Sequence, residues 1–274
     1  MGFNVLCIGD VVGRPGCLVL SEKLVELRER FELDCIIANV ENAAGGSGLT
    51  PNLYAKFERY GVDLMTLGDH VYRKVDIIPV LEQSPTIVRP ANLPPDAPGR
   101  QIAIWDSPSG PRVALVTVLG RLFMRPQVDC PYRAVDRLLA TLDKDVKIIV
   151  VEMHAEATSE KIGMGWHLDG KASLVFGTHT HVQTADERVL PNGTGYITDL
   201  GMTGPHEGIL GRDKERVLSA MISAVPTPFH VCNDDVRLCG IVASFDPGTG
   251  RCLSVQRVVE RLEAGNQSPT DETL

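Results

Sequence analysis

The chain has 274 residues, of which 43% are hydrophobic, 23% are charged and 5% are aromatic, and its formal net charge is -8. The acidic balance disfavours a broad DNA-binding face, and the small number of aromatic residues disfavours a stacking platform for single-stranded nucleic acid. A small phosphate-containing substrate is still compatible with this charge, because bound metal ions can reverse the local field.

Short apolar segments that end in polar residues alternate with helical segments along most of the chain. We expect strands at 4–10, 34–42, 62–70, 113–120, 146–154 and 172–181, and helices at 18–30, from Thr50-Pro51 onward and within 132–142. This alternation predicts an α/β fold with a largely parallel sheet. The stretches 193–204, 236–245 and 252–259 resemble antiparallel strands.

The chain shows no internal repeat and no linker long enough to separate domains. We therefore expect one domain over residues 1–263, followed by a disordered polar tail at 264–274. Seven scattered cysteines without a CxxC pair indicate a reduced, cytoplasmic protein. No signal peptide and no membrane-spanning run is expected, and a homo-oligomer is compatible with the sequence.

Polar residues at the ends of the predicted strands are the most informative feature of the sequence. In open α/β sheets, ligands bind outside the carboxyl ends of the strands. Five strand ends carry candidate metal ligands or catalytic groups: Asp10, Glu41 with Asn42, Asp69 with His70, His154, and His179 with His181. Each has a structural alternative when taken alone, such as a helix cap or a turn. Their joint occurrence favours one shared metal site over several independent coincidences.

The pair His179 and His181 lies in the segment "GTHTH". In an extended segment, residues two apart point to the same side, which suits two ligands of one metal site. Carboxylate, amide and imidazole donors without thiolate suit Mn²⁺, Fe or Zn²⁺ better than a Ca²⁺ cage. The candidates are too many for one ion, so we expect two divalent ions about 3.5–4 Å apart that act on a phosphate.

Seven ordered motifs resemble the YmdB-like branch of the calcineurin-like metallophosphoesterases. They are "GDVVGRPG" (9–16), "NVENAAGGSGLT" (39–50), "GDHVYRK" (68–74), "RPANLP" (89–94), "HAEATSEK" (154–161), "GTHTHVQTAD" (177–186) and "DLGMTGP" (199–205). The resemblance covers nearly the whole chain. It implies a four-layer α-β-β-α sandwich with two central mixed sheets. It also implies a phosphodiesterase that hydrolyses 2′,3′-cyclic nucleotides through metal-activated hydroxide, with Fe, Mn or Zn as the metals.

The same resemblance implies a role for each candidate residue. Glu41 would bridge the two metals. Asp10, Asn42 and His181 would complete the first site, and Asp69, His154 and His179 would complete the second. His70 would lie just outside the metals and position the scissile phosphate or protonate the leaving oxygen, a task suited to imidazole.

One position departs from the family pattern, which usually reads Gly-Asn-His where this chain has Gly68-Asp69-His70. With Asp10 and Glu41, the third carboxylate changes the formal ligand charge from -2 to -3. Two divalent ions carry a charge of +4, so the net formal charge of the metal centre falls from +2 to +1. We expect tighter metal binding, a weaker pull on an anionic diester and a slower reaction.

Other polar and glycine residues are open to two readings. The glycines of the loop after Glu41 could admit substrate or merely allow a turn, and two arginines could bind phosphate or be solvated. These residues are Gly45, Gly46, Gly48, Arg14 and Arg121, and His206 could lie near the site.

Three functional alternatives remain at this stage. An amidohydrolase-type barrel also uses a His-x-His pair, although that pair normally comes early in the chain. A phosphomonoesterase or nucleotidase would use the same ligand types. A regulatory binding protein could use metals to organise a surface for a partner.

Overall fold

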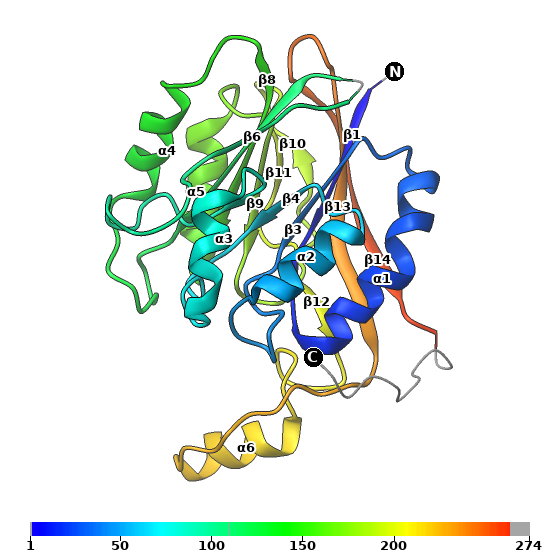
Figure 1. The fold of residues 1–274 in the computed structure, drawn as a ribbon, viewed down its shortest axis with the longest axis vertical. Coiled ribbons are helices and arrows are strands. Elements are labelled where there is room, and N and C mark those ends of the chain that lie inside the picture. Colours follow the sequence, from blue (N-terminus) through cyan, green and yellow to red (C-terminus); the bar gives the residue numbers. More distant parts are fainter. Residues whose placement is uncertain (1, 109, 264–274) are drawn as a thin grey trace.

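The computed structural model describes residues 2–108 and 110–263, so the tail expected at 264–274 lies outside the described residues. Two β-sheets pack face to face, and helices cover their outer faces (Figure 1). The layers follow the order α-β-β-α, which confirms the predicted sandwich of two mixed sheets. The two open sheets exclude the amidohydrolase-type barrel that was one of the functional alternatives.

The first sheet has eight strands in the order β2-β12-β13-β1-β3-β4-β5, with β14 beside β13. The strands are β1 (Phe3–Ile8), β2 (Asp10–Val11), β3 (Cys35–Asn39), β4 (Leu64–Thr66), β5 (Ile87–Val88), β12 (Met202–Pro205), β13 (Val236–Phe245) and β14 (Cys252–Arg261). Strands β1, β3, β4 and β5 run parallel, whereas β13 is antiparallel to β1, β12 and β14. The parallel strands are buried on both faces, which explains their continuous apolar runs.

The second sheet has six strands in the order β10-β11-β9-β8-β7-β6. They are β6 (Ala103–Trp105), β7 (Arg112–Leu119), β8 (Val146–His154), β9 (Leu174–Thr178), β10 (Arg188–Val189) and β11 (Gly195–Ile197). Only the edge strands β6 and β10 are antiparallel to their neighbours. The expectation of antiparallel strands in 193–204 holds for one neighbour of each strand. β11 is antiparallel to β10 but parallel to β9, and β12 is antiparallel to β13 but parallel to β2.

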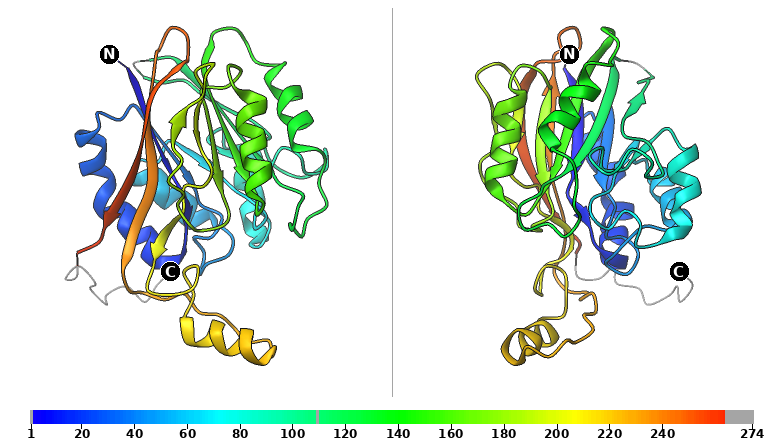
Figure 2. Two further views of the ribbon diagram at one scale, coloured as in Figure 1. Left: turned by 180° about the vertical axis from the view of Figure 1, so that it is seen from behind. Right: turned by 90° about the vertical axis from the view of Figure 1, so that its left-hand side faces the viewer.

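Three apolar layers hold the sandwich together. Helices α1 (Gly13–Arg30), α2 (Pro51–Arg59) and α3 (Ile78–Gln83), the last preceded by the 3-10 turn η1 (Val75–Ile77), cover the first sheet. Helices α4 (Pro131–Leu139) and α5 (Thr158–Leu168) cover the second. Apolar side chains of both sheets pack between them. The two further views show the sheets face to face with helices on the outside (Figure 2).

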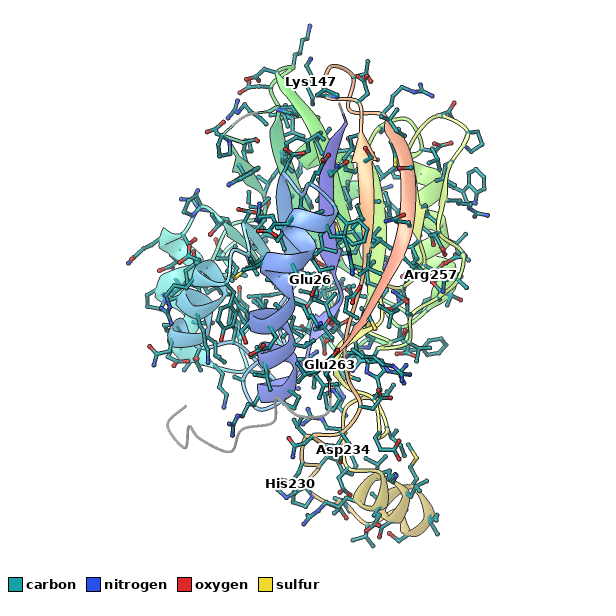
Figure 3. The ribbon with its side chains drawn as sticks, turned by 90° about the vertical axis from the view of Figure 1, so that its right-hand side faces the viewer. Glu26, Lys147, His230, Asp234, Arg257 and Glu263 are labelled. Atoms are coloured by element: carbon teal, nitrogen blue, oxygen red, sulfur yellow. The ribbon has the colours of Figure 1, made fainter. Side chains whose placement is uncertain are left out.

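A long excursion between β12 and β13, residues 206–235, extends away from the layers; we call it the arm. It carries α6 (Lys214–Ser223), of which only Val217 is buried. His230 and Asp234 mark its returning limb, at the opposite end of the molecule from Lys147 (Figure 3). The sequence analysis did not predict this helix. Within the described part of the chain, no helix combines the length and apolar content that crossing a bilayer requires.

Candidate metal centre

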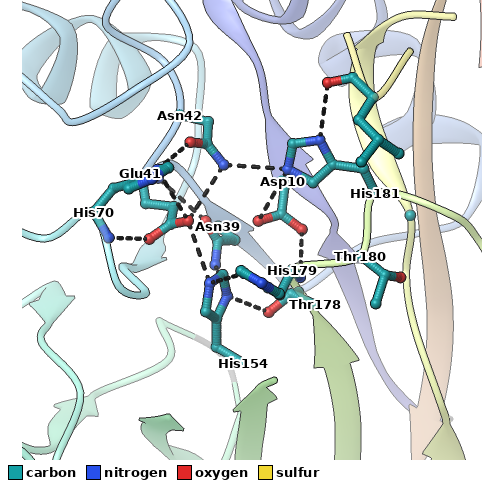
Figure 4. Close-up of polar contacts among 12 residues, drawn as sticks. Asp10, Asn39, Glu41, Asn42, His70, His154, Thr178, His179, Thr180 and His181 are labelled. Atoms are coloured by element: carbon teal, nitrogen blue, oxygen red, sulfur yellow. Dashed lines mark hydrogen bonds and ion pairs between the residues drawn. The ribbon is translucent and has the colours of Figure 1, made fainter. Parts of the chain in front are cut away.

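All eight candidate residues from the sequence converge at one end of the sandwich, and all of them except Asp69 are labelled in Figure 4. Glu41 and Asp69 lie within three residues of the ends of β3 and β4 in the first sheet. In the second sheet, His154 is the last residue of β8, and His179 directly follows β9. Since the parallel strands in each sheet end at the same edge, side chains distant in sequence meet there. The site therefore lies between the two sheets, and both contribute to it.

The first cluster of donors surrounds the buried side chain of His154. Its Nε2 lies 3.2 Å from Asp69 Oδ1, 3.3 Å from Glu41 Oε1 and 3.1 Å from His179 Nδ1. One ligand atom from each of these four residues falls within 4.8 Å of all the others. Two imidazole nitrogens and two carboxylate oxygens directed at one point are a suitable donor set for a divalent transition metal.

A second group of donors adjoins the first through Glu41. Asn42 Nδ2 lies 3.3 Å from both Glu41 Oε1 and His181 Nε2, and His181 Nε2 lies 3.9 Å from Asp10 Oδ1. Asp10 is fully buried, yet its Oδ1 has no hydrogen-bond partner. A buried, unpartnered carboxylate oxygen is costly, and a cation would satisfy it. Ligation by Asn42 requires its amide to turn over, because its Oδ1 now accepts from His70.

The electrostatics of these groups also fit a bound cation. Burial raises the pKa of Asp10 to about 7. Burial by itself would lower the pKa of His154, but the carboxylates of Glu41 and Asp69 raise it well above its usual value. The raised pKa values of Asp10 and His154 mean that both side chains favour a bound proton when no metal is present. A bound metal ion would take the place of these protons and supply the positive charge. Burial lowers the pKa of His181 to about 4, which keeps this imidazole neutral and able to ligate.

Hydrogen bonds behind the donors set the tautomers of two histidines. The hydroxyl of Thr178 donates to Glu152, so it accepts from His154 Nδ1 at 2.9 Å. Nδ1 of His154 therefore keeps its proton, and a metal ion that displaces the proton from Nε2 would meet a lone pair directed at the cluster. In the same way, His181 Nδ1 donates to the carbonyl of Leu210 at 3.3 Å, which frees Nε2. The sequence analysis missed these partners, and Leu210 in particular lies on the arm, far from any motif that carried chemistry.

The segment that carries His179 and His181 is not extended, so that expectation is wrong. Both residues adopt left-handed backbone conformations, with φ of 94° and 64°, which are unusual for non-glycine residues. His179 contacts His154, whereas His181 contacts Asn42, so the two rings serve different groups of donors. The backbone N–H of His179 also donates to Asp10 Oδ2 at 3.0 Å.

His70 lies beside the donors and is 27% exposed, which gives it access to a substrate. Its Nδ1 lies 2.7 Å from Asn42 Oδ1, and its backbone N–H donates to Glu41 Oε2 at 2.9 Å. Because the amide oxygen of Asn42 can only accept, Nδ1 carries a proton, and Nε2 is left for other chemistry. His70 is not one of the four residues of the His154 cluster, and its place relative to bound metals stays a prediction.

A cleft of about 300 Å³ opens over the site. Its lining consists of Glu41, Asn42, Gly46, His70, Glu156, His179, Thr180, His181, Leu210 and Arg212. The guanidinium of Arg212 donates to the carbonyls of Gly45 and Gly46. A side chain at position 46, where φ is +87°, would overlap with this guanidinium, so glycine is required there.

Arg212 is the cation of this cleft that the sequence analysis missed, since "GILGRD" follows no motif for phosphate binding. Across residues 2–108 and 110–263, no carboxylate lies within ion-pair distance of it. The arginines proposed from the sequence, Arg14 and Arg121, are both exposed and do not line the cleft. His206 is also outside the cleft, with its Nδ1 2.9 Å from the carbonyl of Gly204.

The two-sheet sandwich, with carboxylates and imidazoles gathered at its edge, defines a protein of the metallophosphoesterase class. A family model described as YmdB-like protein matches residues 6–258. The chain belongs to this YmdB-like family.

Relatives with assigned names support the same placement. The chain is 42% identical over 256 residues to the 2′,3′-cyclic-nucleotide 2′-phosphodiesterase of Bacillus subtilis strain 168, with 93% of this chain and 96% of that protein covered. It is 32% identical over 261 residues to a putative phosphatase/phosphodiesterase of Mycoplasma genitalium, with 93% and 92% covered.

Two solved structures share the fold. One is a hypothetical protein from Thermus thermophilus, with a TM-score of 0.88, 39% identity, and 94% of this chain and 99% of that chain covered. The other is described as a novel phosphatase from Mycoplasma pneumoniae, with a TM-score of 0.89, 28% identity, and 95% and 94% covered.

Proposed function

We propose that this chain, as one domain over residues 1–263, is a dinuclear-metal phosphodiesterase that hydrolyses 2′,3′-cyclic nucleotides. One observation carries the proposal: Glu41 lies between two groups of converging donors, one of which contains the unpartnered buried oxygen of Asp10. The printed name of the Bacillus subtilis relative supports the choice of substrate.

Seven residues supply the ligands in this proposal, and the convergence of their donor atoms supports it. Glu41 would bridge the ions. Asp10, Asn42 and His181 would hold one ion, and Asp69, His154 and His179 would hold the other. When bound, the ions would neutralise phosphate charge and lower the pKa of a water molecule. Imidazole and carboxylate donors without thiolate favour Fe and Mn, with Zn also compatible.

His70 and Arg212, which also line the cleft, would bind the substrate and donate a proton to it. Once the amide of Asn42 turns over to ligate an ion, its Nδ2 would donate to His70 Nδ1. The imidazole proton would then lie on Nε2, from which His70 would protonate the leaving ribose oxygen in the cleft. The guanidinium of Arg212 has donors to offer to the non-bridging phosphate oxygens, since no carboxylate of the described residues neutralises it.

Metal analysis combined with an activity assay tests the proposal. Purified protein is assayed with 2′,3′-cyclic AMP and with AMP, with Mn²⁺, Fe²⁺ or Zn²⁺ added and after chelation. We expect about two metals per chain, hydrolysis of the cyclic diester in preference to the monoester, and loss of activity with the metals. Glu41→Gln should lose metal and activity, whereas the exposed Asp76→Asn should lose neither.

Two results would contradict the proposal. Faster hydrolysis of AMP than of the cyclic diester would identify a phosphomonoesterase or nucleotidase. Protein that holds two metals and hydrolyses no phosphate ester would identify a metal-organised binding protein instead.

A further inference from the structure

A second pocket, of about 280 Å³, borders the candidate metal centre through Asp69. Its walls include Tyr72, Arg73, Leu93, Leu119 and Pro126, none of which belongs to the donor set. We propose that this pocket binds the nucleobase of the substrate. The inference rests on the proposed function and deepens it, because it makes the enzyme specific for nucleosides rather than for any cyclic phosphate.

The "RPANLP" motif (89–94) contributes Leu93 to the pocket and positions neighbouring parts of its wall through hydrogen bonds. Asn92, 1% exposed, accepts from the N–H of Leu119 at 2.9 Å. Its amide donates to the carbonyls of Leu119 at 2.8 Å and of Asp129 at 3.0 Å. It therefore ties together both ends of the loop that carries Pro126, while the adjacent Leu93 forms part of the wall.

Arg89, from the same motif, and Tyr72 both bind backbone carbonyls of the segment that follows the motif. The guanidinium of Arg89, on a side chain that is 1% exposed, donates to the carbonyls of Pro90 at 2.8 Å and Ala97 at 3.0 Å. The hydroxyl of Tyr72 donates to the carbonyl of Pro98 at 2.6 Å, which holds the ring in the wall. A pocket whose walls are already fixed costs little ordering when a ligand enters.

The chemistry of the walls suits a flat heteroaromatic ring. Leu93, Leu119 and Pro126 offer apolar surface, and Tyr72 adds an aromatic ring. Arg73 supplies a guanidinium that can stack on a base or donate to its edge. A second phosphate group fits poorly, because it would leave the apolar walls unused and would meet the carboxylate of Asp69.

The position of Asp69 links the pocket to the reaction. This residue belongs both to the cluster of metal donors and to the pocket wall. In a 2′,3′-cyclic nucleotide, the ribose alone separates the phosphate from the base. A substrate with its phosphate at the donors can therefore reach the pocket with its base.

The test compares 2′,3′-cyclic AMP with a base-free substrate, the 2,3-cyclic phosphate of methyl ribofuranoside. We expect kcat/KM to favour the nucleotide by about tenfold or more. Leu93→Trp fills the pocket and should lower kcat/KM for the nucleotide at least about ten times more than for the base-free diester. Leu253→Trp, the same change at a site on β14 that is 59% exposed, should shift neither value beyond about twofold.

A second measurement does not depend on how the variants fold. Adenosine should inhibit hydrolysis of the base-free diester by the unaltered enzyme, because it occupies the base pocket. Equal kcat/KM for the two substrates, equal losses in Leu93→Trp or absence of inhibition by adenosine would each overturn the nucleobase inference. Failure of the unaltered enzyme to hydrolyse either diester would instead overturn the proposed function.

Discussion

Lys161 Nζ lies 2.6 Å from Asp199 Oδ2, and both side chains are 1% exposed. The same carboxylate accepts from the hydroxyl of Thr180 at 2.7 Å and from its backbone N–H at 3.3 Å. Thr180 lies between His179 and His181, the two residues with left-handed backbones. This buried ion pair therefore holds the strained segment that presents both histidines.

Removal of one partner leaves a buried charge without compensation. Lys161→Met should reduce the free energy of unfolding by about 3–5 kcal/mol, measured by urea denaturation. The exposed Lys171→Met should change it by less than about 0.5 kcal/mol. A loss below about 1 kcal/mol in Lys161→Met would show that this pair does not stabilise the segment.

Asp69 is the position at which we expect the chain to depart from the family pattern. Its Oδ1 lies 3.2 Å from His154 Nε2 and 3.5 Å from His179 Nδ1, so the extra negative charge is within the donor cluster. Asp69→Asn should weaken metal binding and raise turnover of the cyclic diester roughly 3–10-fold, which corresponds to about 1 kcal/mol of barrier. Metal titration and kcat at saturating metal measure the two effects. A large loss of turnover at full metal occupancy would show that the carboxylate assists catalysis.

Substitution of His70 distinguishes a proton donor from a metal ligand at this position. His70→Ala should lower kcat by roughly 10²–10⁴-fold, because the leaving oxygen loses its proton donor. The metal content should remain that of the unaltered protein, as determined by elemental analysis. Loss of metal along with activity would place His70 among the ligands. His206→Ala, outside the cleft, provides the matched control.

Arg212 tests whether the arm contributes to substrate binding. Arg212→Gln should raise KM for the cyclic diester about tenfold or more, because a charged hydrogen bond contributes about 1.5–3 kcal/mol. Metal content should not change. Arg212→Lys should recover part of the loss, since the charge is kept. Arg216→Gln, on the exposed face of α6, should leave KM within about twofold. If KM were unchanged in Arg212→Gln, Arg212 would not bind substrate, and its role would be limited to the hydrogen bonds with the carbonyls of Gly45 and Gly46.

The sequence by itself determined the alternation of the main buried strands with helices and the eight polar residues at the strand ends, although it left helices such as α6 unpredicted. Burial explains this, since strands buried on both faces must be continuously apolar, and an interruption by Asp10, Glu41 or His154 marks an edge. The family motifs then indicated which of these residues act together. None of these features requires knowledge of how distant segments pair.

Only the tertiary structure decided which sheet each strand joins and how the donors are oriented. β11 and β12, separated by a few residues, enter different sheets because their partners β9 and β13 lie elsewhere in the chain. The left-handed backbone of His179 depends on contacts with Asp10 and on Thr180 held by Asp199. Arg212 reaches the cleft only because the arm returns to the glycine loop. Local sequence does not encode such long-range contacts, since their energy arises only when distant segments pack.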